Sequence, residues 1–221
     1  GLLAFFTVEG KESLFVCNFI SYDARGGIIL KLLEDRIRQD GVVLPGNVLK
    51  VNQFLNHQID PQLMYEIGQE FARLFKERPV TKILTVEASG IAPAIMAGLV
   101  MNVPVLFARK KKPSTLDDRT YTAEVYSYTK KVTNTISVDS KFLSNNDHVL
   151  IVDDFLANGQ AVKGMLEICK QADVKVEGVG IVVEKSFQEG ADWIKGQGIR
   201  LESLARISSF ENDTVHFVGE E

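Results

Sequence analysis

The chain has 221 residues, 45% of them hydrophobic, and a formal net charge of −4 at pH 7. This length suffices for one domain with a substantial core. The mild acidic excess argues against a broad nucleic-acid-binding face, which would need a basic stripe. Cys17 and Cys169 are far apart, with no CxxC motif, so we expect neither a disulfide framework nor a zinc site, and a reduced, cytoplasmic location. The sequence contains no run of about 18 apolar residues, so we expect no membrane span.

The first 29 residues differ from the rest. Their aromatic clusters show no helical or alternating period, and they lack the basic start and apolar centre of a signal peptide. One interpretation is an extra strand or hairpin. The other is upstream translation, because "ARGGIIL" permits a purine-rich ribosome-binding site, a spacer and a TTG start codon at Leu30. We therefore divide the chain into an N-terminal appendage, 1–29, and a main domain, 30–221.

Two helices are predicted next. "LLEDRIRQD" spaces its apolar residues for a short amphipathic helix that stops at Gly41. After the turn-rich stretch "VVLPGNVLKVNQFLNHQ", Asp60 as the capping residue and Pro61 in the first turn predict a second helix. Its core-facing side chains recur at the helical period and are Leu63, Met64, Ile67, Phe71, Leu74 and Phe75.

Four short, apolar and β-branched segments predict strands: "KILTVE", "VPVLFA", "HVLIVD" and "EGVGIVVE". Segments of helical length, 91–101 and 160–172, separate them. This alternation is typical of βαβ units, so we expect an α/β fold with a central, mostly parallel sheet flanked by helices. "TAEVYSYT" and "NTISVD" alternate polar and apolar residues, which predicts a half-exposed antiparallel hairpin.

The segment "HVLIVDDFLANGQA" joins two acids to an anion-binding turn. We expect Asp153 and Asp154 at the carboxyl end of a strand, where open parallel sheets bind ligands. The amides of residues 157–159 and of the helix that starts near Gln160 form an anion cradle. Because carboxylates cannot usefully contact a phosphate, the two halves must bind different parts of one ligand. A sugar phosphate has those parts: its diol meets the aspartates and its phosphate the amides.

The same string resembles the phosphoribosyl pyrophosphate motif of the type I phosphoribosyltransferases, which reads as four apolar residues, two acids, two apolar residues and Ala-Thr-Gly-Gly-Thr. It departs from that pattern at Asn158, Gln160 and Ala161. These changes remove hydroxyl donors and leave the backbone cradle intact. From Leu32 to the C-terminus, the order of elements and several local strings most resemble the bacterial xanthine phosphoribosyltransferases.

The resemblance implies transfer of ribose 5-phosphate from phosphoribosyl pyrophosphate to xanthine, giving xanthosine monophosphate and pyrophosphate. It also implies a hood formed by N-terminal and C-terminal segments, a lid formed by the hairpin, a homodimer, and Mg²⁺ that bridges the substrates without a dedicated protein metal site. The alternatives are an enzyme that prefers guanine, hypoxanthine or adenine, and a non-enzymatic regulator that senses phosphoribosyl pyrophosphate. Residues 1–29 are too short and insufficiently basic for the winged helix of such a regulator.

Two further segments obtain roles from the resemblance. "EASGIAPA" resembles the pyrophosphate-binding loop, with Ser89 and Gly90 at its turn. An ordinary strand-to-helix connection can have the same kind of sequence. "ARKKKPST" resembles the basic entry to the lid, although a charge run is usually a solvated face. The catalytic residues implied are Asp153, Asp154 and Arg109. Those implied to bind phosphoribosyl pyrophosphate are Ala157, Asn158, Gly159, Gln160, Ala161, Ser89, Gly90 and Lys111.

The xanthine-binding residues implied lie in two other segments. In "VEKSF", Lys185 matches the position that meets the purine's 6-oxo oxygen, and Phe187 is a stacking candidate, although a lone strand-end lysine is more often solvated. "VLKVNQFLNHQ" resembles the base-recognition segment, with Leu49 and Asn56 at base-contacting positions. A side-chain amide has both a donor and an acceptor, which suits the paired groups of xanthine.

Overall fold

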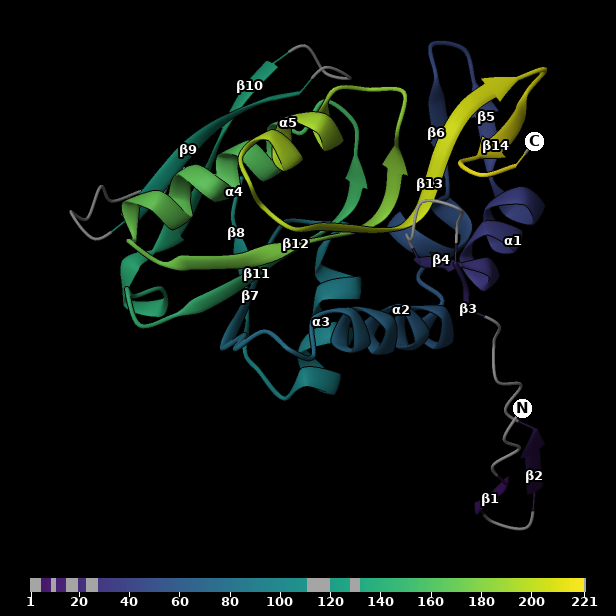
Figure 1. Ribbon diagram of the computed structural model, residues 1–221, viewed down its shortest axis with the longest axis horizontal. Helices are drawn as coiled ribbons and strands as arrows, with labels where there is room; N and C mark the ends of the chain where they lie inside the picture. The colour runs from purple at the N-terminus through teal and green to yellow at the C-terminus, as the bar shows by residue number, and fades with distance from the viewer. Residues whose placement is uncertain are drawn as a thin grey trace.

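The central element of the molecule is a six-stranded sheet with the order β14-β13-β12-β11-β7-β8 (Figure 1). The computed structural model describes residues 5–8, 11–14, 20–22, 28–110, 120–127 and 132–220. Neighbouring strands of the sheet pair in parallel except β13 and β14, which are antiparallel. The strands are β7 (Lys82–Val86), β8 (Val105–Ala108), β11 (His148–Leu156), β12 (Lys175–Lys185), β13 (Leu201–Glu211) and β14 (Thr214–Phe217).

Helices cover both faces of this sheet (Figure 1). α2 (Pro61–Leu74) and α3 (Ile91–Met101) lie on one face, and α4 (Gln160–Gln171) and α5 (Gly190–Gly196) on the other. Alternate residues of β11 therefore enter two separate cores: Leu150 packs on the α2 side, and Val149 and Ile151 pack on the α4 side. Burial on both faces explains why the central strands are continuous apolar runs, and it confirms the predicted α/β fold.

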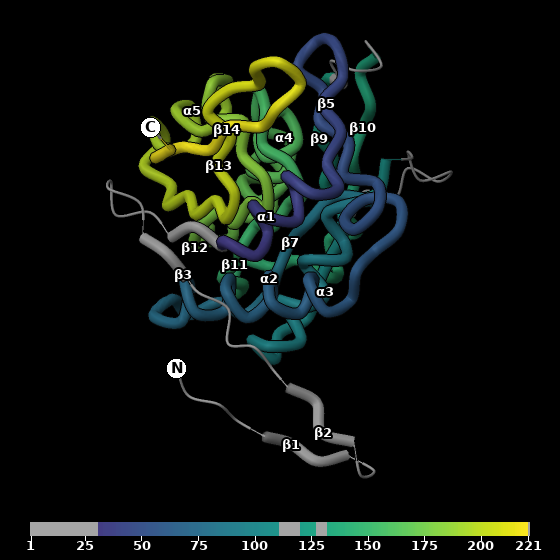
Figure 2. Tube along the Cα trace, turned by 90° about the vertical axis from the view of Figure 1, so that its right-hand side faces the viewer, coloured from purple at the N-terminus to yellow at the C-terminus, as the bar shows by residue number. Residues whose placement is uncertain are grey.

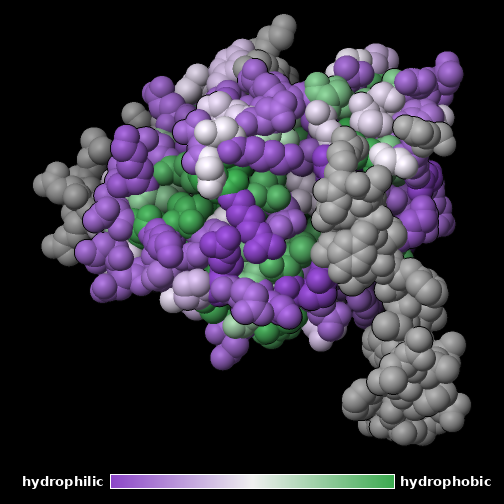
Figure 3. Space-filling view, in the orientation of Figure 1, coloured by the Kyte–Doolittle hydropathy of each residue, from purple (hydrophilic) through white to green (hydrophobic). Residues whose placement is uncertain are grey.

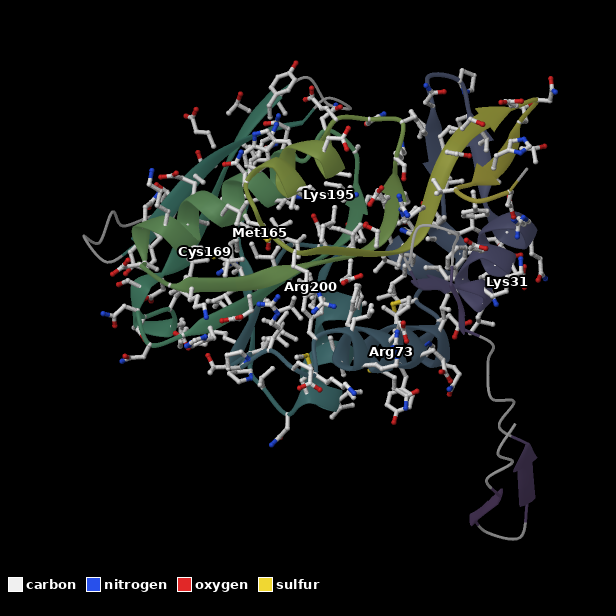
Figure 4. The ribbon with its side chains drawn as sticks, in the orientation of Figure 1. Lys31, Arg73, Met165, Cys169, Lys195 and Arg200 are labelled. Atoms are coloured by element: carbon white, nitrogen blue, oxygen red, sulfur yellow. The ribbon has the colours of Figure 1, made fainter. Side chains whose placement is uncertain are left out.

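Met165 and Cys169 lie on the face of α4 that packs into the second core (Figure 4). Both are at most 1% exposed. Burial raises the pKa of the Cys169 thiol to about 12, so this cysteine is a packing residue with little thiolate at neutral pH. Figure 3 shows the surface of the molecule in the orientation of Figure 1. This surface is largely hydrophilic, with an apolar area where α4 meets the sheet.

α2 begins as its sequence predicts. The carboxylate of Asp60 accepts hydrogen bonds of 3.1 Å from the amides of Gln62 and Leu63, and Pro61 occupies the first turn. The six apolar side chains predicted to face the core are at most 8% exposed. The predicted helix is therefore confirmed, and its apolar stripe forms much of the first core.

α1 (Lys31–Asp40) confirms the other predicted helix. The amide of Gly41 donates to the Ile37 carbonyl at 2.8 Å, and a Cβ on Gly41 would lie 2.3 Å from that same oxygen. Only glycine therefore fits where this helix ends.

The turn-rich stretch after α1 contains more regular structure than its composition predicts. β5 (Val42–Leu44) and β6 (Val48–Lys50) form an antiparallel hairpin, followed by a π-helical turn at Asn52–Asn56. Together with α1, β14 and the adjoining part of β13 they form the hood, at one end of the sheet (Figures 1 and 2). Arg38 of α1 pairs with Glu220 and lies 4.7 Å above the Phe217 ring. These contacts confirm that N-terminal and C-terminal segments build the hood.

The predicted antiparallel hairpin is confirmed as β9 (Thr120–Ser127) and β10 (Val132–Asp139), here called the lid hairpin. It is anchored on α4, because the Gln171 amide donates to the Thr122 carbonyl at 2.8 Å and accepts from the Thr122 amide at 3.1 Å. A Cβ on Gly164 of α4 would lie 2.5 Å from Val125 of the hairpin. A short 3-10 turn, Ser140–Phe142, follows the hairpin.

The described residues before α1 form two antiparallel pairs. β1 (Phe5–Val8) pairs with β2 (Lys11–Leu14), and β3 (Ile20–Tyr22) pairs with β4 (Ile28–Leu30). β4 also contacts β13. No helix in the described ranges is both long and apolar enough to cross a membrane.

Candidate active site

Most of the predicted site residues lie at one edge of the sheet. The turns that follow β7, β11 and β12, residues 87–90, 157–159 and 186–189, leave the carboxyl ends of neighbouring parallel strands, and Arg109 follows β8. This edge is where open α/β sheets bind their ligands. β11 occupies the middle of the group, so its acidic pair lies between the other turns.

The acidic pair lies inside β11 rather than after it, which corrects the predicted strand end. β11 continues to Leu156 because the long strand β12 still supplies partners, with Phe155 opposite Val183. On the other side, pairing with β7 stops at Ile151. Asp153 and Asp154 therefore lie on a stretch of strand whose β7 side is open to the turn after β7.

Both carboxyl groups are buried. Asp153 is 3% exposed and Asp154 is 9% exposed, and the Asp154 amide donates to Asp153 Oδ1 at 3.0 Å. Burial, then the negative charge of Asp154 and a hydrogen bond with its side chain, raise the pKa of Asp153 well above its usual value, while the hydrogen bond from the Asp154 amide and the positive charge of Lys110 oppose this. The free protein therefore holds a proton on Asp153 more readily than on an ordinary aspartate.

The turn after β7 packs directly against this pair. A Cβ on Gly90 would lie 2.8 Å from Asp153 Oδ1 and 2.4 Å from the hydroxyl of Thr85, so only glycine allows so close an approach. The backbone amide of Lys110 donates to the Glu87 carboxylate at 2.6 Å, which fixes the turn to the segment after β8. The buried Gly90 thus lies beside Asp153, next to the half-buried Ser89, and the role of these two residues in binding pyrophosphate stays a prediction.

A pocket of about 180 Å³ lies beyond the carboxyl end of β11. Gly159 has a left-handed φ of +76° and precedes α4, with no side-chain cap. The first amides of α4 therefore lack both intrahelical acceptors and a capping oxygen, which leaves them available to an anion. The lining includes all five residues predicted to bind the phosphate, together with Tyr126 of the lid hairpin, which the sequence did not identify; its members are Tyr126, Phe155, Leu156, Ala157, Asn158, Gly159, Gln160, Ala161 and Val162.

On the β12 side of the acidic pair, the hood orients Lys185, which lies at the end of β12. Its ammonium donates to the Asn47 carbonyl at 2.7 Å and lies 5.8 Å from the Phe210 ring. Burial lowers the pKa of Lys185. Phe187 meets Phe210 edge to face, with centroids 5.5 Å apart. Lys185 is thus a half-buried, oriented donor rather than a solvated strand end.

The remaining predicted residues are less closely joined to this group. Leu49 is 6% exposed and belongs to the first core, and Asn56 is exposed at the end of the π-helical turn.

Arg109 is exposed, and its backbone exchanges two hydrogen bonds of 2.9 Å with Ser137 of the lid hairpin. Lys111 lies outside the described residues. The neighbouring Lys110, which the sequence treated only as part of a charge run, supplies the positive charge felt by Asp153.

Comparison with known proteins identifies the family. No protein-family model matches the chain. The xanthine phosphoribosyltransferase of Ligilactobacillus salivarius (strain UCC118) is 70% identical over 192 residues, which cover 87% of this chain and 100% of that relative. The xanthine phosphoribosyltransferase of Lactobacillus acidophilus (strain ATCC 700396 / N2 / NCFM / NCK56) is 59% identical over 87% of this chain and 100% of its own length. The chain belongs to the xanthine phosphoribosyltransferase family.

Solved structures agree with this membership at the level of the fold. The chain superimposes on the adenine phosphoribosyltransferase of Trypanosoma brucei with a TM-score of 0.66 at 18% identity, covering 79% of each chain. With the enzyme of Giardia lamblia the TM-score is 0.65 at 22% identity, over 80% of this chain and 98% of the other. The xanthine phosphoribosyltransferase family thus provides the frame in which the acidic pair, the pocket and Lys185 are interpreted.

The burial of Asp153 generates a stability prediction. Its raised pKa means that the folded state keeps a proton that the unfolded state loses, so stability falls as pH rises from the ordinary aspartate pKa through the raised one. Asp153→Asn removes this ionisation and keeps the shape. We expect the variant to melt higher than the parent at pH 8, by roughly 2–4 °C for each kcal/mol gained, and the difference to shrink at pH 5.

The matched control is Asp173→Asn, at an exposed residue with a φ of +54° that asparagine also tolerates. Melting curves of the three proteins at both pH values test the prediction. An Asp153→Asn variant that melts below the parent at pH 8 would contradict it.

Proposed function

We propose that this chain transfers ribose 5-phosphate from phosphoribosyl pyrophosphate to xanthine, releasing xanthosine monophosphate and pyrophosphate. The observation that carries the proposal is the arrangement of three different chemistries along one sheet edge: the anion pocket at residues 157–161, the buried acids Asp153 and Asp154, and the oriented ammonium of Lys185. Relatives with high identity over nearly their whole length carry the name of this activity.

Each part of phosphoribosyl pyrophosphate has a matching group. The 5-phosphate is received by the amides around Gly159, and the ribose diol donates hydrogen bonds to Asp153 and Asp154. The pyrophosphate lies toward Ser89 and Gly90, with Arg109 and the adjoining lysines neutralising the charge that grows as its bond to the sugar breaks. The acids stabilise the positive charge that develops on the ring at the same moment. Binding and charge complementarity therefore promote the reaction without a covalent nucleophile on the protein.

The carboxylates of the site are the kind of ligand that magnesium prefers, and we propose that the substrates hold most of the ion. Within the described ranges, no group of three or more His, Cys, Asp or Glu side chains is placed to hold a metal ion. Asp153 and Asp154 are the carboxylates nearest to the proposed sugar site and would contribute to holding the ion. Mg²⁺ held there would supply positive charge that offsets the negative charge of the substrate oxygens.

Lys185 suits a 6-oxopurine. An ammonium has three donors, so it can keep the Asn47 carbonyl and donate a second hydrogen bond to the 6-oxo oxygen. Adenine presents an amino group at this position, which would face a like donor and leave the half-buried lysine poorly satisfied. The choice of xanthine over guanine and hypoxanthine then depends on groups near the purine's 2-position, for which Asn56 is our candidate. Phe187 and Leu49 complete the proposed base site.

Pyrophosphate release in the presence of phosphoribosyl pyrophosphate, Mg²⁺ and one base at a time tests the proposed function. We expect xanthine to give the highest kcat/KM among xanthine, guanine, hypoxanthine and adenine. A higher value for another base would favour the enzymatic alternative. Tight binding of phosphoribosyl pyrophosphate with no release for any base would favour the regulator.

Substitutions in the same assay separate the roles of two residues. Lys185→Gln is expected to lower kcat/KM for every 6-oxopurine by at least roughly tenfold, since a hydrogen bond to a charged group contributes about 1.5–3 kcal/mol, and to weaken discrimination against adenine. Asn56→Ala should reduce the preference for xanthine over guanine and hypoxanthine more than it changes the affinity for phosphoribosyl pyrophosphate. Lys195→Gln, at an exposed lysine of α5, is the control (Figure 4). Parental xanthine kinetics in Lys185→Gln would remove Lys185 from the base site.

We also propose that residues 30–221 form the catalytic domain and residues 1–29 are an appendage. Strands β7 to β14, and all core residues among the side chains that the structure describes, come after residue 30, which supports this division. A chain that starts at Leu30 should keep the parental melting temperature and kcat/KM for xanthine. Loss of cooperative melting in that chain would instead assign the appendage, through the contact of β4 with β13, to the folded domain. The homodimer and the cytoplasmic location implied by the resemblance stay predictions.

A further inference from the structure

The anion pocket is in contact with a residue far from its own motif. Gly190, the first residue of α5, donates its amide to the Ala157 carbonyl at 3.0 Å. A Cβ on Gly190 would lie 2.3 Å from that carbonyl oxygen and 2.9 Å from the Gly159 nitrogen. In the opposite direction, a Cβ on Gly159 would lie 3.3 Å from the Gly190 Cα. The backbone of the phosphate loop and the start of α5 therefore touch with no room for a side chain.

The constraint at Gly190 is one of space and not of backbone conformation. Gly159 has a left-handed φ of +76°, whereas Gly190 is outside the group of glycines with positive φ. Alanine at 190 is therefore compatible with the local backbone, and its cost comes from the collision alone. Because two of the nearest atoms belong to the backbone of the phosphate loop, rotation of a side chain cannot relieve it. The loop itself must move.

Gly190 also ends the turn that begins at the base-binding lysine. The Ser186 amide donates to the Ile207 carbonyl at 2.8 Å, and the Gln188 amide donates to the Lys185 carbonyl at 2.9 Å. One short turn, residues 185–190, thus carries the proposed base contact at its start and the contact with the phosphate loop at its end. Ser89 and Gly90, which are proposed to meet the pyrophosphate, follow a different strand and do not depend on this turn.

We propose that Gly190 is a positioning residue for the 5-phosphate subsite, which holds the amides of the phosphate loop in place by close contact and by its hydrogen bond to Ala157. The inference rests on the proposed function, because it takes the pocket at residues 157–161 as the seat of the sugar's phosphate. It predicts a selective effect: displacing the loop weakens ligands that carry the 5-phosphate and spares pyrophosphate.

The test compares Gly190→Ala with Gly196→Ala, which is also in α5 but whose added Cβ meets nothing within 4 Å. For Gly190→Ala we expect the KM for phosphoribosyl pyrophosphate and the inhibition constant of ribose 5-phosphate to rise about tenfold, the loss of roughly one hydrogen bond to a charged group. The inhibition constant of pyrophosphate and the KM for xanthine should stay within about twofold of the parent. Gly196→Ala should resemble the parent throughout.

Equal kinetic constants in the two variants would overturn the proposal, and so would a uniform loss for all four ligands, which would indicate a general structural role. Should Gly190→Ala fail to fold, the ¹⁵N amide resonance of Gly190 in the parent protein gives an independent test. It should shift on addition of ribose 5-phosphate and not on addition of pyrophosphate, and no shift with ribose 5-phosphate would overturn the proposal. A parent whose Gly190 resonance shifts with ribose 5-phosphate, but which transfers the ribose 5-phosphate group of phosphoribosyl pyrophosphate to no base, would reject the proposed function alone.

Discussion

The burial of two adjacent carboxyl groups in the middle of a parallel sheet is the constraint on which the rest of the site depends. Asp153 and Asp154 lie where β11 has lost its partner β7 and is still paired with β12. Burying carboxylates is unfavourable unless they are paired or protonated, and the nearby positive charge of Lys110 only partly offsets the effect on Asp153. The free protein therefore keeps an electrostatically unfavourable centre. A ligand with hydroxyl donors and a developing positive charge relieves it, which is the preorganisation that transition-state stabilisation requires.

Glycines at two points bring the anion-binding segments close to this centre. Gly90 allows the turn after β7 to approach Asp153, and Gly159 allows the chain to enter α4 with its amides exposed. In the proposed function these two segments receive the two ends of phosphoribosyl pyrophosphate. The hood adds the third component, because the Asn47 carbonyl orients Lys185 from outside the sheet. In the proposed function, xanthine selection therefore belongs to a different segment from the one that activates the sugar, and we expect that the two can be altered separately.

The sequence predicted those features that depend on local chemistry. Asp60 and Pro61 fix the start of α2, and "HVLIVDDFLANGQA" identifies the acids and the phosphate loop, because capping, apolar periodicity and a glycine turn act over a few residues.

Features that depend on tertiary contacts were not predicted. The end of β11 moved beyond Asp153 because β12 supplies partners, and the contact of Gly190 with Ala157 joins segments that no short motif connects. β13, whose residues are unevenly buried, offered no clear period. Tyr126 lines the pocket from the lid hairpin, which Gln171 helps to anchor on α4.

Proton release on binding tests most directly the claim that the ligand relieves a buried acid. Calorimetric titration of the protein with phosphoribosyl pyrophosphate and Mg²⁺ at a series of pH values above the ordinary pKa of aspartate, in two buffers with different ionisation enthalpies, gives the number of protons exchanged. The ionisation of the ligand itself contributes equally to the parent and to Asp153→Asn, so the difference between them isolates the carboxyl group. We expect the parent to release more protons than Asp153→Asn at pH values below the raised pKa of Asp153, because the diol and the charge around it favour the ionised form of Asp153. Equal release from the two proteins, with ligand binding retained in both, would contradict this claim.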